Sequence, residues 1–600
     1  MLQPKRILLA GLGVATLTTS VFFTGCKPKS DNSAETAASP GRTAPANQPE
    51  AFTGQLTEIA GIQGIYTLRH PKLIFAELDT LMAAVPEASM IRMFFGGLAP
   101  YGHPEFSELA AGSNIGIAVL EITKEELAAQ KPTIVAFAKL KKGGKIWNAL
   151  GQTGLALKTD GDWTWIAKDE ADFAKVTAPA AVFAHIEQPQ AEELRAWGRV
   201  SPALLDAAKT PVFEKLKTSI EKRPADEQAA IVAYADVLWG YLSQLHSAGG
   251  SLDLNDDGLV IAYDGQFTPD SASGRYLRYP AGPSPKIAQS VPADGLMSAI
   301  VRQNVTGQTE FVNGLLDALI AVDYPEGKKA LTDAKGGFNA FAKGSDGSGV
   351  MTMSMGMPKG DEVPEVAMLG INPGNYTEAD VFSFYETTLD VSKRFTDAML
   401  SSAASLNPGA PAPTVSQELN ENAFEIDGVR FGSVVTTVTI KGEEDAEDQT
   451  TTTAQYFGVV GGNLVYGTDE AALRAKLPAI AANRAVDNPV NLTFADGEVM
   501  VGAVHGENIV SMVAASLSLD TTDADVQAQL ASFKKGFVAA GPVEMAFSAQ
   551  QAKAAVTVSI PYKFIAQGVR FGQFAAAYSV ASMENESAPS GEEEVMTGQE

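Results

Sequence analysis

The chain has 600 residues, of which 45% are hydrophobic, and a formal net charge of −26 at pH 7. This acidity excludes nucleic acid as a partner, because phosphate binding requires clustered Lys and Arg side chains. The hydrophobic content predicts a globular body, and its length exceeds what one ordinary core holds. Because Cys26 is the only cysteine, the chain forms no intramolecular disulfide.

The chain begins with a basic segment, Lys5 and Arg6, followed by the uncharged residues 7–23. This run is short for a membrane span and has the length of the apolar region of a signal peptide. It ends in the sequence Phe23-Thr24-Gly25-Cys26, which resembles the signal of bacterial lipoproteins. In that family a small residue precedes an invariant cysteine. An ordinary signal peptide with a chance cysteine, or an uncleaved anchor, is the alternative.

The lipoprotein resemblance implies cleavage after Gly25, so that residues 1–25 are a signal peptide. It also implies a diacylglyceryl group on the Cys26 thiol and acylation of the new amine, with palmitate-type chains holding the protein on the membrane. Phe23 departs from the family, which prefers Leu at that position. Lys27, where a retained lipoprotein would have Asp, implies the outer membrane of a Gram-negative bacterium.

Both ends of the remaining chain are predicted to be disordered. Residues 26–60 are rich in Ser, Ala, Pro, Asn and Thr, and form a tether with an average reach of about 30 Å. Residues 581–600 form an acidic tail that contains six glutamates. The body therefore lies between these two segments.

The body is predicted to be α+β, with two tandem similar units of mostly antiparallel sheet and packed helices, at residues 61–285 and 286–580. Four landmarks recur in the same order in both units. They are a pair of strands, a strand running into a short helix that an Asp-Glu pair is expected to open, a further strand followed by a helix, and a terminal hairpin after a helix. These landmarks occupy residues 115–141 and 350–372, 162–176 and 462–477, 180–197 and 498–513, and 251–267 and 543–560.

This layout resembles uncharacterised duplicated domains of bacterial exported proteins and lipoproteins, a resemblance that brings no known active site. The Pro- and Gly-rich residues 280–285 are the expected joint between the two units.

The sharpest motif for a metal is Asp253-Leu-Asn255-Asp-Asp257-Gly258 with Asp264 after it. Oxygen ligands at these spacings, with Gly at the sixth position, are typical of a calcium loop. The alternative is a plain hairpin turn, which Asp257-Gly258 favours between two alternating strands. The sequence favours the turn. No cofactor is expected.

Met351, Met353, Met355 and Met357 alternate along one predicted strand, so that all four share a face. Three roles fit them: plain core, the wall of an apolar ligand groove, or Cu(I) ligation. The histidines show no metal-ligand spacing and are expected to be structural; they are His70, His103, His185, His246 and His505.

No nucleophile, phosphate-loop or metalloprotease motif is present in the sequence. The leading hypothesis is a membrane-tethered binding or scaffold lipoprotein of the cell envelope, with a protein or other envelope component as partner. A carrier or chaperone for an apolar ligand in a sheet-lined groove is the first alternative. An envelope hydrolase with dispersed active-site residues is the second, so catalysis stays undecided.

Overall fold

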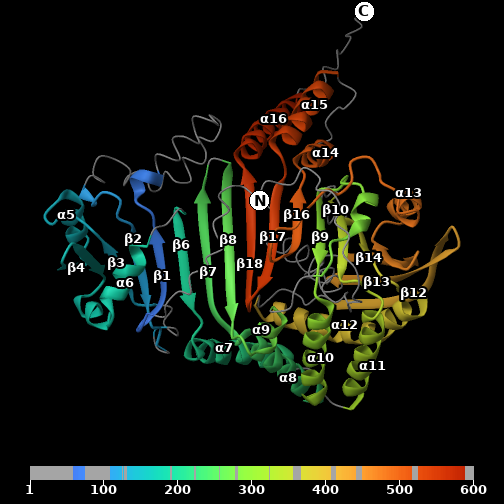
Figure 1. Ribbon diagram of the computed structural model, residues 1–600, viewed down its shortest axis with the longest axis horizontal. Helices are drawn as coiled ribbons and strands as arrows, with labels where there is room; N and C mark the ends of the chain where they lie inside the picture. The colour runs from blue at the N-terminus through green and yellow to red at the C-terminus, as the bar shows by residue number, and fades with distance from the viewer. Residues whose placement is uncertain are drawn as a thin grey trace, which may run out of the picture.

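The computed structural model describes residues 59–74, 108–123, 126, 131–188, 192–221, 225–255, 257–277, 282–322, 325–355, 366–406, 414–440, 449–516 and 524–587. Within them, 18 strands form one sheet, and every strand pair is antiparallel (Figure 1). Helices lie mainly along two opposite ends of the strands. The α+β class predicted from the sequence is confirmed.

The first half of the chain supplies eight neighbouring strands. In spatial order from the outer edge they are β4 (Ala156–Asp160), β5 (Trp163–Ala167), β3 (Ile134–Ala138), β2 (Ile115–Leu120), β1 (Ile62–Leu68), β6 (Leu194–Arg199), β7 (Leu245–Leu254) and β8 (Gly258–Phe267).

The second half continues the same sheet to its other edge. Starting from β8, the strands are β18 (Lys553–Pro561), β17 (Val543–Gln550), β16 (Glu498–Val504), β9 (Met297–Arg302), β10 (Ser348–Met355), β11 (Val366–Asn372), β15 (Asn463–Gly467), β14 (Gln449–Val460), β13 (Val429–Ile440) and β12 (Thr414–Ile426).

The strand order within the two halves is the same when both are followed outward from the β8–β18 pair. Outward from the pair, the first half runs β8, β7, β6, β1, β2, β3. The second half runs β18, β17, β16, β9, β10, β11, which is the same order of corresponding strands. Only β12 and β13 have no counterpart. This is the order expected of a duplicated chain, but the two sets of strands share one sheet. That the halves superpose as similar units stays a prediction.

Helices connect many of the consecutive strands, either singly or as pairs. In chain order the described helices are α5 (Lys145–Gln152), η4 (Glu170–Lys175), α6 (Pro179–Ile186), α7 (Pro202–Ile220), α8 (Ala225–Leu242), α9 (Ala272–Tyr276), η5 (Lys286–Ser290), α10 (Val305–Val322), α11 (Pro325–Ala342), α12 (Glu378–Leu406), α13 (Glu470–Ala481), α14 (Gly506–Ser516), α15 (Ala524–Ala540) and α16 (Tyr562–Ser587). None of these described helices has the length and apolar character that crossing a membrane requires.

Local sequence explains where several helices begin. The Ser201 hydroxyl accepts a hydrogen bond from the Leu204 amide, and Pro202 follows as the first helical residue of α7. The Asp469 carboxylate accepts from the amides of Ala471 and Ala472 at the start of α13. This matches the expectation that the acidic pair there opens a helix.

The third landmark was predicted wrongly in the first half. Residues 180–197 were expected to run from strand to helix, but they form helix α6 and then strand β6. Pro179 is the first residue of α6, and the Ala-rich sequence after it favours a helix. Trp197, expected on a helix, lies in β6 and is buried in the core.

Each half has its own packed core. In the first half, Ile65, Val135, Phe137 and Trp165 are buried on one face of the sheet under η4 and α6. In the second half both faces are covered. One cluster includes side chains of α10, α11 and α12, and the other includes side chains of η5 and α13. The central strands β7, β8, β18 and β17 contribute few buried side chains.

Candidate binding surface

One face of the first-half sheet carries an unbroken series of apolar side chains. Residues directly opposite each other on paired strands point to the same face. Starting at β2 and moving across to β17, one row of direct neighbours is Ile117, Tyr66, Ala196, Gly250, Tyr263, Val556 and Phe547. The next row, two residues along each strand, is Ile115, Leu68, Leu194, Leu252, Ile261, Val558 and Met545.

Several of these side chains are open to solvent. Six large apolar residues on the described strands are between 37% and 62% exposed, and all six lie on this one face. We call them the apolar face: Ile134, Ile117, Tyr66, Leu194, Tyr263 and Val556. At one end of this face, Leu68 and Leu252 of the second row pack against a small cluster that includes Ala566 of α16. The six side chains beyond it stay exposed, and exposed groups of apolar side chains mark interaction sites.

The opposite face of the same strands has a different character. At its outer strands it holds the buried core of the first half, and at its centre it becomes polar. Asp264 and Lys553 pair there, with 2.6 Å between carboxylate oxygen and amine, and Thr557 lies on the adjacent row. The apolar face is therefore not the inner side of the first-half core.

The same face is covered in the second half. Following the row outward, Phe547 lies opposite Met500, and Met500 lies opposite Val301. On the adjacent row Met351 lies opposite Ala299 and packs against the cluster formed with α10, α11 and α12. In this region helices cover the apolar side chains that remain exposed in the first half.

The methionine strand follows the predicted alternation. Met351 and Met353 are half-buried on one face of β10, and Thr352 is buried on the other. The core contact of Met351 agrees with the plain-core interpretation of that residue. Met357 and the side chain of Met355 lie outside the described residues.

The four residues of the candidate calcium loop do not gather at one point. Asn255 caps the turn, because its side-chain oxygen accepts from the amides of Asp257 and Gly258. Asp253 is buried and receives a hydrogen bond from Asn255. Asp264 lies opposite Gly249, far along the ladder from Asp253, and its carboxylate pairs with Lys553. This geometry is that of the hairpin turn.

One serine–histidine–carboxylate contact that the sequence did not indicate occurs where β16 ends. The Ser298 hydroxyl lies 2.8 Å from His505 Nε2, and His505 Nδ1 lies 3.8 Å from a Glu507 oxygen. Burial lowers the pKa of His505. However, Ser298 is buried in β9, which is paired on both sides, so the strand leaves no free amide for an oxyanion.

Two of the histidines are buried. His70 is held near β1 and His185 in α6, while His103 lies outside the described residues. Burial, reinforced by the Arg195 charge, lowers the pKa of His185 to about 4. An unfolded histidine titrates near 6.5, so the unfolded chain takes up this proton first as the pH falls.

We expect His185 to make the protein less stable as the pH falls from 6.5 towards 4. Between pH 7 and pH 5 its contribution to the free energy of unfolding should decrease by about 2 kcal/mol. Urea unfolding of wild type and His185→Gln at both pH values measures this difference. An equal pH dependence in both proteins would show that His185 is not the responsible group.

The sequence did not reveal the apolar face. Each of its strands alternates as an ordinary half-buried strand does, for example Leu259, Ile261 and Tyr263 in β8. Only the register across strands unites these residues. Among the residues that the structure describes, no group of three or more His, Cys, Asp or Glu side chains could hold a metal ion. No family model, curated protein or solved structure matches this chain.

Proposed function

We propose that the chain is a lipid-anchored binding protein of the bacterial cell envelope, held on the outer membrane through Cys26. Its ligands are lipids or lipidated molecules, and their acyl chains bind to the apolar face. The single observation that supports this function is the exposure of six large apolar side chains on one face of the sheet. Cys26 itself lies outside the described residues.

The chemistry of the apolar face favours acyl chains over a protein surface. The strands beneath it are paired on both sides, so their backbone groups are not available to an added strand. Apart from the hydroxyls of Tyr66 and Tyr263, the six side chains have no hydrogen-bonding group. Protein interfaces carry about one hydrogen bond per 100–200 Å². A ligand that needs almost none fits this face better.

This function includes the carrier alternative, because a tethered protein that binds acyl chains can also pass them on. A hydrolase gains no support from the described residues, because Ser298 is buried in a strand that is paired on both sides. The hypothesis of a passive scaffold gives the exposed apolar side chains no role. A scaffold would therefore bind its partners through a different surface.

The proposed ligand can be tested with a photo-crosslinking amino acid in intact cells. The crosslinker at position 263 faces the proposed ligand. The matched control at position 262 lies on the same strand, with its side chain on the opposite face. Mass spectrometry of the peptide that carries the crosslinker should show a lipid adduct at 263 and none at 262. No adduct at 263, or equal adducts at both positions, would contradict the proposal.

The anchor is tested separately. We expect Cys26→Ser to abolish lipidation, because a serine hydroxyl does not replace the thiol that accepts the diacylglyceryl group. Metabolic labelling with a fatty-acid analogue measures this loss as the label on the purified chain. Equal labelling of wild type and variant would rule out the lipoprotein assignment. It would not contradict the proposal that the apolar face binds acyl chains.

A further inference from the structure

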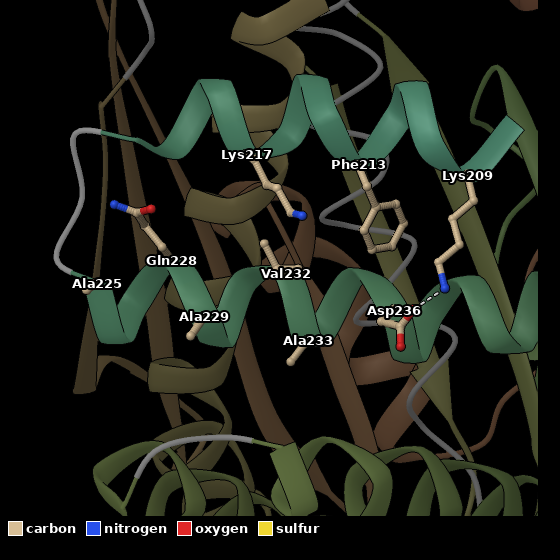
Figure 2. A pocket seen from close by; sticks show the side chains of 9 residues that line it. All are labelled: Lys209, Phe213, Lys217, Ala225, Gln228, Ala229, Val232, Ala233 and Asp236. Atoms are coloured by element: carbon tan, nitrogen blue, oxygen red, sulfur yellow. Dashed lines mark hydrogen bonds and ion pairs between the residues drawn. The ribbon is translucent and has the colours of Figure 1, made fainter.

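Helices α7 and α8 form an antiparallel pair with an open groove of about 620 Å³ between them. Figure 2 shows Phe213 and Lys217 of α7 directed towards α8, and Val232 and Gln228 of α8 directed towards α7. The remaining lining residues are Lys209, Ala225, Ala229, Ala233 and Asp236. From these contacts we infer that the groove binds an amphipathic helix of a partner protein, with an acidic side chain of that helix on Lys217.

The shape of the groove suits a helix. Ala225, Ala229 and Ala233 recur every four residues along α8, so small side chains line its length. From Ala225 to Asp236 the groove follows α8 for about 17 Å, or three helical turns, at 1.5 Å per residue. An open trough of this length between two helices matches the docking of a third helix by its apolar stripe.

The groove also has a fixed aromatic wall. The Phe213 ring meets the Trp239 ring edge-on, with 6.2 Å between ring centroids. Lys209 Nζ lies 5.2 Å from the centre of the Phe213 ring and also forms an ion pair with Asp236. The ring is therefore held in place before any partner arrives, and the Lys209 charge is balanced within the groove.

Lys217 supplies the charge complementarity. It is exposed, and in the described part of the chain its amine has neither a hydrogen bond nor an ion pair. Among the residues that line the groove, two lysines and one aspartate leave one positive charge, on a protein of net charge −26. At physiological salt the net charge is screened beyond about 8 Å, so the contact with Lys217 decides which side chain is preferred there. A carboxylate on the partner helix would form an ion pair with the Lys217 amine.

The probe for this inference is a designed, dye-labelled helical peptide with leucines at positions 1, 4, 8 and 11 and glutamates beside them. A second peptide has lysines in place of the glutamates. Fluorescence anisotropy with the full lipidated chain in detergent should show saturable binding of the glutamate peptide. Binding of the lysine peptide should be at least fivefold weaker. No saturable binding of the glutamate peptide, or equal binding of both, would overturn the inference.

Variants of the chain locate the site. Lys217→Met should weaken binding of the glutamate peptide about fivefold, which corresponds to the loss of one exposed ion pair. Lys215→Met, on the same helix but outside the groove, should bind as wild type does. Ala229→Leu fills the groove and should weaken both peptides at least tenfold. An unchanged affinity in Lys217→Met or Ala229→Leu would overturn the assignment to this groove.

Two further measurements separate other occupants. Tyr263→Ser alters the apolar face and should leave peptide binding unchanged, so this inference and the proposed lipid function can fail independently. Sedimentation should show the wild-type chain as one species at increasing concentration. A dimer that Ala229→Leu abolishes would assign the groove to a second copy of the chain and overturn the partner helix.

Discussion

Phe137→Ala should lower the free energy of unfolding of the first-half core by about 4 kcal/mol. Phe137 is fully buried in β3 and meets Trp165 and Phe183 edge-on, with centroid distances of 5.4 and 5.8 Å. Deleting such a ring removes its transfer free energy and leaves a cavity that rigid neighbours do not fill, which costs 3–5 kcal/mol in known cores. The other two rings are themselves fixed by further aromatic contacts, so little relaxation is expected.

Hydrogen exchange measures this effect locally. Peptides from β2, β3 and β5 should lose protection, while peptides from β13–β15 serve as an internal reference in the other half. Phe137→Leu, which keeps most of the volume, should cost less than half as much. A loss below about 1.5 kcal/mol in the alanine variant would show that the core closes over the cavity.

Gly258→Ala should destabilise the joint between the two halves by about 3 kcal/mol, at the upper end of the cost of overpacking. Gly258 begins β8 opposite Pro561 of β18. A Cβ there would lie 2.2 Å from the Ile560 carbonyl oxygen and 2.9 Å from its carbon. Both atoms belong to the backbone, so no side-chain rotation relieves the contact. One strand must shift, and the hydrogen bonds at that end of the pair are lost.

The matched control is Gly568→Ala in α16, where a Cβ meets nothing within 4 Å. Alanine is a better helix former than glycine, so this change should be neutral or stabilise by up to about 1 kcal/mol. Urea unfolding of both variants, with amide exchange in β8 and β18, tests the joint. If the two variants unfold alike, the close approach of β8 and β18 is wrong.

Much of the fold was predictable because its signals are local. Alternating apolar residues placed the hairpin β7–β8 and the strand β10, and an Asp-Glu pair placed the start of α13. The pairing of β8 with β18 was not predictable. It joins residues about 300 positions apart in the chain, and neither strand has a local sequence feature that identifies its partner strand.

The candidate surface was hidden for the same reason. Tyr66, Leu194 and Tyr263 are each unremarkable in their own strands, and they become one surface only when the registers of β1, β6, β7 and β8 are known. The α7–α8 groove depends on how two helices lie against each other. Residues with conspicuous spacing, such as Asp253 and Asn255, instead serve a turn that their own sequence explains.

The β8–β18 pair also sets an order of events during synthesis. All eight described strands of the first half precede residue 268, whereas β18 is the last strand that the structure describes. Until β18 has been made, β8 is an edge strand whose N–H and C=O groups on one side have no partner. A nascent chain therefore exposes a template for strand addition throughout the synthesis of its second half. When two copies reach this stage together, the β18 strand of either can complete the sheet of the other, so we expect exchanged dimers among the misfolded products of this chain.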